Sequence, residues 1–292
     1  MINISESIKQ CFDWLNILQN PDIFLTPVLT GFDGLDKLIA GFHKGDLIVV
    51  GARPGMGKTS FASNIACHLA LTQNKRITFF SLEEGHEQLS FRMLSTVASV
   101  AMSKLQTGQL TGDERKRLAK AGAALSKSEV YIDDTPGVSV SEMKAKLRKQ
   151  KNVDLVIIDY LQLMSDALCK NADTKEETSG IIYCLKAMAE ELHIPVLLLS
   201  QLPSRVDKRP GHCPNISDLK SLGVIDYDGD MVQFMDVVLF LHSDYYYVSG
   251  HKNREELDEN ATECIVVKNR YGDTGTVPLK WYGEYATFTS VD

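Results

Sequence analysis

The chain has 292 residues, of which 44% are hydrophobic and 24% charged, so it can form one large domain or two small ones around a sizeable core. Its formal net charge of −7 argues against general nucleic-acid binding, so contacts with phosphates must come from local clusters of Lys and Arg. The apolar runs are much shorter than the roughly 20 residues of a membrane span, and the N-terminus does not match a signal peptide. We therefore expect a cytoplasmic protein without a membrane contact.

The N-terminal segment, residues 5–19, has the spacing of an amphipathic helix. Its apolar residues share one face at about 3.6-residue periodicity: Ile8, Cys11, Phe12, Leu15 and Leu18. Ser5 is a candidate N-cap, and Pro21 follows the predicted end. This helix either packs on the core of its own domain or, because a short linker follows it, docks on another subunit.

From residue 46 onward, short β-branched runs alternate with longer helical stretches. The runs are residues 46–51, 77–81, 130–133, 155–159, 195–200, 237–242 and 264–268. This alternation is typical of an α/β fold with a mainly parallel central sheet flanked by helices. Residues 47–50 and 155–158 are apolar at every position, which predicts strands in the centre of the sheet, buried on both faces.

The strongest local signal is the sequence ARPGMGKT at residues 52–59, between an apolar run and a helical stretch. Gly55 and Gly57 let the backbone curl, so that its N–H groups point at phosphate oxygens. Lys58 supplies positive charge to the terminal phosphates, and the hydroxyl of Thr59 is available to Mg²⁺. The predicted nucleotide-binding residues are Arg53, Pro54, Gly55, Met56, Gly57, Lys58, Thr59 and Ser60.

A phosphate-binding loop needs carboxylates on neighbouring strands. Asp159 ends the apolar run 155–159, where it is placed to hold Mg²⁺ together with Thr59. A base that orients the attacking water is also needed, and Glu83 follows the run 77–81 at the same edge of the sheet. Glu84 is next to it, and spacing alone does not decide between the two.

Three more residues at strand ends are candidates. Gln201 follows the run 195–200, where an uncharged amide can sense a terminal phosphate or simply make a surface hydrogen bond. Lys268 and Arg270 have the i, i+2 spacing that puts both side chains on one face of a strand. This pair either reaches the phosphates of a neighbouring subunit or forms a solvated basic strand end.

Together, these segments resemble the C-terminal motor domain of DnaB-type replicative helicases over nearly the whole chain. The resemblance is carried by residues 30–36 (TGFDGLD), 51–59 (GARPGMGKT), 80–83 (FSLE), 133–137 (DDTPG), 158–164 (IDYLQLM), 200–202 (SQL), 207–210 (DKRP) and 267–270 (VKNR). It implies a RecA-like P-loop core in residues 26–292, preceded by a linker helix and linker in residues 1–25 that dock on the adjacent subunit. It also implies ATP and Mg²⁺ as cofactors.

The resemblance further assigns roles to the candidate catalytic residues. Glu83 matches the general base of the family, and Glu84 stands where the family usually has Met. Arg92 matches an arginine that reaches the terminal phosphate, and Gln201 matches the phosphate sensor. Lys268 and Arg270 match residues that act across the subunit boundary, where an arginine finger is worth roughly 10³ to 10⁵ in rate.

The loops of the family that contact DNA correspond to residues 202–223. Candidate DNA-binding residues in this region are Arg205, Lys208, Arg209, Lys220 and Gly223. Residues 220–223 (KSLG) replace the more familiar Arg-Glu-Ser-Gly, so this region departs from the family pattern.

The implied function is a homo-hexameric helicase that translocates 5′ to 3′ on single-stranded DNA during replication, with a primase and a helicase loader as further candidate partners. The chain has no room for the N-terminal domain of the family, so it is either a fragment or a motor that works alone. Other classes remain open: a RecA-like ATPase of recombination or regulation, a binding module that uses nucleotide to stabilise a ring, and a P-loop kinase.

Overall fold

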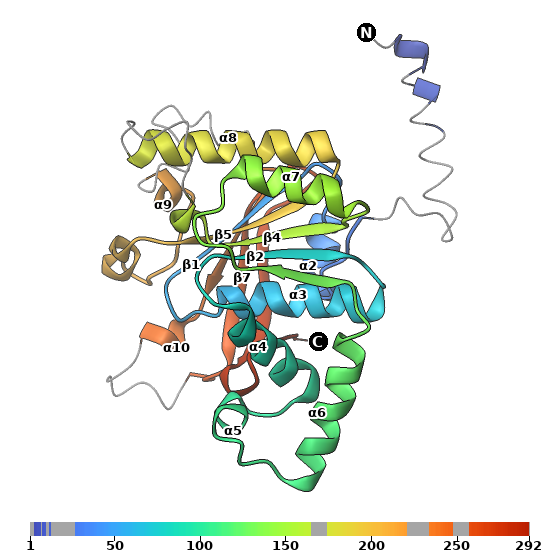
Figure 1. The fold of residues 1–292 in the computed structure, drawn as a ribbon. Helices are drawn as coiled ribbons and strands as arrows, with labels where there is room; N and C mark the ends of the chain where they lie inside the picture. The colour runs from blue at the N-terminus through green and yellow to red at the C-terminus, as the bar shows by residue number, and fades with distance from the viewer. Residues whose placement is uncertain are drawn as a thin grey trace.

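A computed structural model describes residues 3–6, 8–9, 12, 27–164, 174–220, 234–247 and 257–291 of the chain (Figure 1). The strands of these ranges form one sheet in the order β3-β2-β4-β5-β1-β6-β7-β8-β9. The first six in that order are parallel, and β7, β8 and β9 continue the sheet antiparallel. The strands are β1 (Leu47–Ala52), β2 (Ile77–Ser81), β3 (Val130–Asp133), β4 (Leu155–Asp159), β5 (Val196–Gln201), β6 (Val237–His242), β7 (Ala261–Asn269), β8 (Gly275–Tyr282) and β9 (Thr287–Ser290).

All seven predicted runs are strands, and the expected parallel core is confirmed. The seventh run is longer than predicted, because β7 extends over Ala261–Asn269. The sequence analysis did not predict β8 and β9. Their side chains only partly alternate between buried and exposed, since these strands lie at the margin of the sheet and not in its doubly covered centre.

Helices cover both faces of the sheet. Figure 1 shows α7 and α8 on one face and α3 on the other. The α-helices are α2 (Asp33–Ile39), α3 (Lys58–Thr72), α4 (His86–Ala98), α5 (Met102–Thr107), α6 (Gly112–Leu125), α7 (Val140–Gln150), α8 (Thr174–Leu192), α9 (Ser217–Lys220) and α10 (Asp244–Tyr247). Three short 3₁₀ helices are η1 (Leu161–Leu163), η2 (Ser204–Lys208) and η5 (Gly283–Tyr285).

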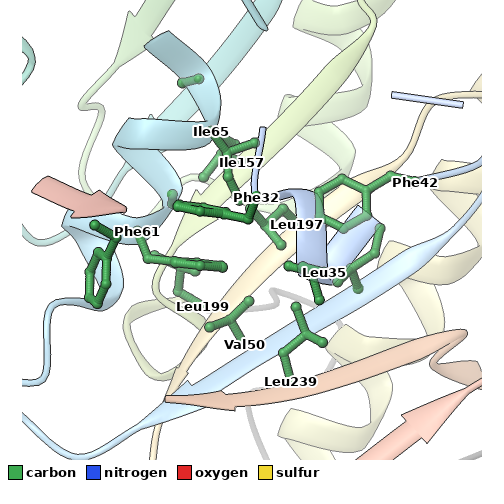
Figure 2. Packing of buried hydrophobic residues seen from close by; sticks show 14 of the residues in the cluster. Phe32, Leu35, Phe42, Val50, Phe61, Ile65, Ile157, Leu197, Leu199 and Leu239 are labelled. Carbon is green, nitrogen blue, oxygen red and sulfur yellow. The ribbon is translucent and has the colours of Figure 1, made fainter. Parts of the chain in front are cut away.

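The hydrophobic core holds β1 and α3 firmly on either side of the loop that joins them. All six residues of β1 are buried. On the face of the sheet that α3 covers, Phe61 of α3 stacks on Phe32 with ring centroids 5.0 Å apart. Both rings pack against Val50 and its neighbours (Figure 2). The loop between β1 and α3 is thus anchored at both ends by buried apolar side chains.

The predicted N-terminal helix lies only partly within the described residues. Residues 4–6, 8, 9 and 12 are helical, and Ile4, Ile8 and Phe12 are exposed. The helix already includes Ile4, so Ser5 is not its N-cap; instead the side chain of Asn3 accepts a hydrogen bond from the Ser5 amide at 2.9 Å. The rest of 5–19 and most of the linker lie outside the described residues. Throughout the described ranges, every helix is too short or too polar to cross a membrane.

Candidate active site

The loop between β1 and α3 has the backbone conformation that a phosphate cradle requires. Gly55 and Gly57 have φ of 79° and 82°, in the left-handed region that favours glycine. A Cβ on Gly57 would lie 2.9 Å from the ring of Phe288 in β9, so a side chain there would also collide. Gly57 caps the first turn of α3, whose N-terminal amides are available to an anion.

Lys58 is buried at the start of α3, with 9% of its surface exposed. Its Nζ donates to the Ala52 carbonyl at the long distance of 3.5 Å. Burial lowers the pKa of Lys58, and the negative charges of Asp159 and Glu83 oppose that effect. The ammonium group therefore lies between the loop and two carboxylates, where a phosphate would complete its coordination.

Thr59 and Asp159 are brought together as the sequence predicts. The Thr59 hydroxyl donates to Asp159 Oδ2 at 2.6 Å, and Asp159 is fully buried at the end of β4. Burial raises the pKa of Asp159 to about 6. Its second oxygen, Oδ1, is buried and has no hydrogen-bond partner among the described residues. An unpaired carboxylate oxygen beside a hydroxyl fits a hard cation such as Mg²⁺, which prefers oxygen ligands.

The two neighbouring glutamates have different surroundings. Glu84 forms an ion pair with Arg92 through both of its carboxylate oxygens. The Glu83 side chain is exposed, makes no ion pair in the part of the chain that the structure describes, and lies close enough to Asp159 and Lys58 for its charge to affect their pKa values. Geometry alone therefore favours Glu83 as the carboxylate open to a water molecule, a choice that spacing left undecided.

Arg92 lies beside the phosphate loop. Its Nη1 donates to the hydroxyl of Ser60 at 2.9 Å, and its other nitrogens bind Glu84. This places the guanidinium group against the first turn of α3, next to Thr59. The predicted contact of Arg92 with a terminal phosphate stays a prediction.

Gln201 ends β5 directly beside Ala52, the last residue of β1. Its backbone is bracketed by Gln162, whose Oε1 accepts from the Gln201 amide at 3.2 Å and whose Nε2 donates to the Gln201 carbonyl at 3.3 Å. The sequence analysis did not single out Gln162, although it lies three residues after Asp159 in the segment 158–164. Gln162 thus links the ends of β4 and β5 next to the loop.

A cavity of about 640 Å³ adjoins the loop at Gly55 and Met56. Aromatic rings of Tyr246 and Trp281 line it, together with polar side chains such as Asn260. The sequence analysis missed this cavity because its walls come from α10, β8 and the turn before β7, none of which has a recognisable motif. A cavity beside a phosphate cradle that combines aromatic rings for stacking with polar side chains for hydrogen bonds has the chemistry of a nucleobase pocket.

Arg53, a predicted nucleotide ligand, has its side chain engaged elsewhere. Its Nε and Nη2 donate to the two oxygens of Asp207 at 2.8 and 2.7 Å, and its Nη1 donates to the Leu202 carbonyl at 2.6 Å. With its side chain engaged in this way, Arg53 would contact a nucleotide through its backbone.

Lys268 and Arg270 lie at the opposite edge of the sheet from the loop. Asn269 pairs with Val237, the first residue of β6, and the loop follows the last residue of β1. The length of β1, six residues at roughly 3.3 Å each, separates the two edges by about 20 Å. An arginine side chain cannot bridge this distance, so Arg270 cannot serve the loop of its own subunit.

The acidic residue Asp236 holds Arg270 in place. It is fully buried and accepts from Arg270 Nη1 at 2.8 Å, from Lys186 Nζ at 2.7 Å and from the Leu47 amide at 2.8 Å. Lys268 donates to the carbonyl of Met235, the preceding residue. Asp236 and Lys186 were not predicted, since their partners are far away in the sequence.

The predicted DNA-binding residues divide into two groups. Arg205 and Arg209 both bind Asp218, with Arg205 Nε at 3.1 Å and Arg209 Nη2 at 2.8 Å from its Oδ1. A phosphate would therefore have to share the two arginines with that carboxylate or displace it. Lys208, between them, is exposed. The side chain of Lys220 and all of Gly223 lie outside the described residues. DNA contact stays a prediction for all five.

Comparisons with known proteins identify the family of the chain. The family model of the DnaB-like helicase C terminal domain matches residues 27–290. The replicative DNA helicase DnaB of Geobacillus stearothermophilus is 38% identical over 293 residues, covering 99% of this chain and 62% of that protein. The replicative DNA helicase DnaC of Bacillus subtilis is 39% identical with the same coverage.

Solved structures give the same result. A DnaB-like replicative helicase, described with its interactions with primase, superposes with a TM-score of 0.84 at 30% identity and covers 100% of this chain and 68% of that chain. A solved ATPase domain superposes with a TM-score of 0.87, again at 30% identity, and covers 99% of each chain. The chain spans about 62% of the length of its curated relatives. The expected RecA-like fold is confirmed, and the chain belongs to the family of DnaB-like helicase C-terminal domains.

Proposed function

We propose that the chain is the motor of a hexameric DNA helicase, which hydrolyses ATP to translocate 5′ to 3′ on single-stranded DNA and unwinds duplex during replication. The observation that carries the proposal is the hydrogen bond from Thr59 to the buried Asp159 next to Lys58, with the second oxygen of Asp159 unpaired among the residues that the structure describes. This arrangement has a place for a phosphate and for a cation at the same strand ends.

Each residue of the site has a role in this proposal. The loop amides and Lys58 bind the terminal phosphates of ATP, while Thr59 and Asp159 hold Mg²⁺. When bound, Mg²⁺ neutralises charge on the phosphate oxygens. Glu83 accepts the proton of the attacking water, because its carboxylate is not engaged by Arg92. Gln201, fixed through its backbone by Gln162, reports whether a terminal phosphate is present.

The need for more than one subunit follows from the position of Arg270. It is about 20 Å from the loop of its own subunit, so in this proposal Arg270 of a ring neighbour adds to Lys58 and Arg92 the cation that stabilises charge on the transferred phosphoryl group. A homo-hexamer around the DNA strand satisfies this need at every interface. Residues 1–25 would then dock on the neighbour through the exposed apolar side chains Ile4, Ile8 and Phe12.

The partners follow from the relatives. One solved relative is described with its interactions with primase, and we extend that partner, together with a helicase loader, to this chain. Work on replicating DNA implies a cytoplasmic location. Lys208, Lys220 and Gly223 are the proposed DNA contacts, joined by Arg205 and Arg209 where a phosphate shares these two arginines with Asp218.

A forked duplex tests the proposal. Wild-type protein with ATP and Mg²⁺ should release the strand from a fork with a 5′ single-stranded tail, and not from a fork with only a 3′ tail. Lys58→Ala should release neither. Strand release by Lys58→Ala equal to wild type, or no release by wild type from either fork, would contradict the proposed function.

A further inference from the structure

An ion pair joins the nucleotide loop to the segment that carries the predicted DNA contacts. Arg53, at the start of the loop, binds Asp207 of η2 with two parallel hydrogen bonds of 2.8 and 2.7 Å. Such a bidentate pair fixes orientation as well as distance. The Arg53 side chain is only 14% exposed and that of Asp207 is 35% exposed, so water screens the pair only in part.

A second contact ties the same segment to the nucleotide side. His212, a few residues after η2, stacks on Tyr247 of α10 with ring centroids 4.2 Å apart and an interplanar angle of 18°. The Tyr247 hydroxyl is buried, and burial, followed by the charge of Asp207, raises the pKa of Tyr247. The neighbouring ring of Tyr246 lies 3.6 Å from where a Cβ on Gly55 would be.

The ion pairs continue from η2 towards α9. Asp218 is fully buried in α9 and binds Arg205 of η2 and Arg209 just after it. The backbone carbonyl of Ser217 also accepts from Arg205. A displacement of η2 would therefore be passed on to the end of α9, where the candidate DNA contact Lys220 lies.

We propose that Asp207 is a positioning residue that couples nucleotide binding to DNA binding, by holding η2 to the loop through Arg53. This rests on the proposed function. The Arg53 guanidinium group is held by both oxygens of Asp207 and by the Leu202 carbonyl, so a shift of the loop backbone on nucleotide binding acts on the segment that carries η2. The rigid pair carries that movement to η2. Because coupling is reciprocal, DNA must change nucleotide affinity by the same factor.

The test measures coupling and not activity. A fluorescein-labelled oligo-dT strand is titrated with protein in the presence and absence of a saturating non-hydrolysable ATP analogue. A fluorescent form of that analogue is titrated with and without unlabelled oligo-dT. We expect wild type to show a coupling factor of about 5 or more. Asp207→Asn should bind each ligand alone within about twofold of wild type, while its coupling factor falls to within about twofold of one.

Two variants serve as controls. Asp154→Asn makes the same substitution at similar exposure, 33% against 35%, and removes the 3.2 Å ion pair with Lys75 at the other edge of the sheet. It should keep the wild-type coupling factor. Asp207→Glu keeps the charge and should retain part of the coupling, and thermal unfolding of all variants checks that they are folded.

The possible outcomes separate the two proposals. Full coupling in Asp207→Asn would overturn this inference and leave the proposed function in place. Loss of affinity for either ligand alone in Asp207→Asn, or equal loss of coupling in Asp154→Asn, would also overturn it, since the residue would then act through stability or direct binding. A wild-type protein that binds the nucleotide but no DNA would overturn the proposed function itself, and the inference with it.

Discussion

Two regions hold candidate ligands for phosphates: the nucleotide edge of the sheet, where Lys58 and Asp159 lie, and the segment from η2 to α9. They differ in whether these ligands already have partners within the chain. At the nucleotide edge, Asp159 Oδ1 is unpaired among the described residues and Lys58 has only a long contact of 3.5 Å. In the η2–α9 segment, Arg205 and Arg209 already bind the carboxylate of Asp218. The first region is prepared for its ligand within one subunit, whereas in the second a phosphate competes with an internal carboxylate.

This difference has a physical cause in burial. A deep site such as that of Asp159 and Lys58 has little water, so polar groups left without partners there are costly until a ligand completes them. In the η2–α9 segment Asp218 is also buried, but its partners Arg205 and Arg209 are more exposed than Lys58 and already bind it. Strong, specific ligand binding is therefore expected at the first region, and salt-sensitive, adjustable binding at the second.

Replacing the buried cation should give the largest effect. We expect Lys58→Ala to abolish measurable ATP turnover, a larger loss than the roughly 10³-fold effect of an arginine finger, because it removes the buried cation of the loop that binds the terminal phosphates. Nucleotide affinity should fall as well, measured by titration of a fluorescent ATP analogue. Lys44→Ala, a lysine outside the site, is the control. Wild-type turnover in Lys58→Ala would show that the nucleotide edge is not the active site.

The next largest effect should come from the opposite edge of the sheet. Arg270→Ala is expected to lower turnover by about 10³-fold, and mixing it with Lys58→Ala protein should restore part of the activity. In mixed rings, a Lys58→Ala subunit still offers Arg270 to an intact loop of its Arg270→Ala neighbour. Absence of rescue in mixed rings, with both variants assembled to the wild-type mass, would argue against action between subunits.

The two glutamates offer a sharper contrast within the nucleotide edge. Glu83→Gln should keep ATP binding and lower turnover by about 100-fold or more, because it removes the base and retains its shape. Glu84→Gln only weakens the ion pair with Arg92 and should have a smaller effect on turnover. Single-turnover hydrolysis separates binding from chemistry for both. A larger loss in Glu84→Gln would mean that the base was assigned to the wrong carboxylate.

The smallest effect should be on stability. Asp218→Asn leaves Arg205 and Arg209 without their buried anion, and should lower the free energy of unfolding by about 1–3 kcal/mol, at the low end because both arginines are partly exposed to water. Urea denaturation measures this change. Asp113→Asn, in a 91% exposed pair with Lys116, should be neutral. Equal stability of Asp218→Asn and wild type would mean that the internal ion pairs of this segment contribute nothing.

Local sequence patterns predicted the parts of the molecule that depend on neighbours in the chain. The alternation of runs predicted the parallel strands, and the glycine spacing predicted the loop with positive φ at Gly55 and Gly57. Because parallel strands end at one edge, the pairing of Thr59 with Asp159, 100 residues apart, was also predictable.

Contacts without such a rule were not predictable. Arg53 and Asp207 are 154 residues apart, and Lys186 and Asp236 are 50 apart. The local sequence pattern does not predict which acidic side chain will form an ion pair with a given basic side chain. The hairpin of β8 and β9 was missed for a similar reason, since its strands lack the continuous apolar run of a buried strand. Instead β8 is stabilised by pairing with β7, and β9 by pairing with β8.

The most direct test of the account is ATP hydrolysis with and without single-stranded DNA, measured beside light scattering for mass at the same protein concentration. Because Arg270 cannot reach its own loop, we predict DNA-stimulated turnover only from an assembly with the mass of about six subunits. Turnover by a monomer at an unchanged rate, with or without DNA, would contradict both the shared site and the motor function.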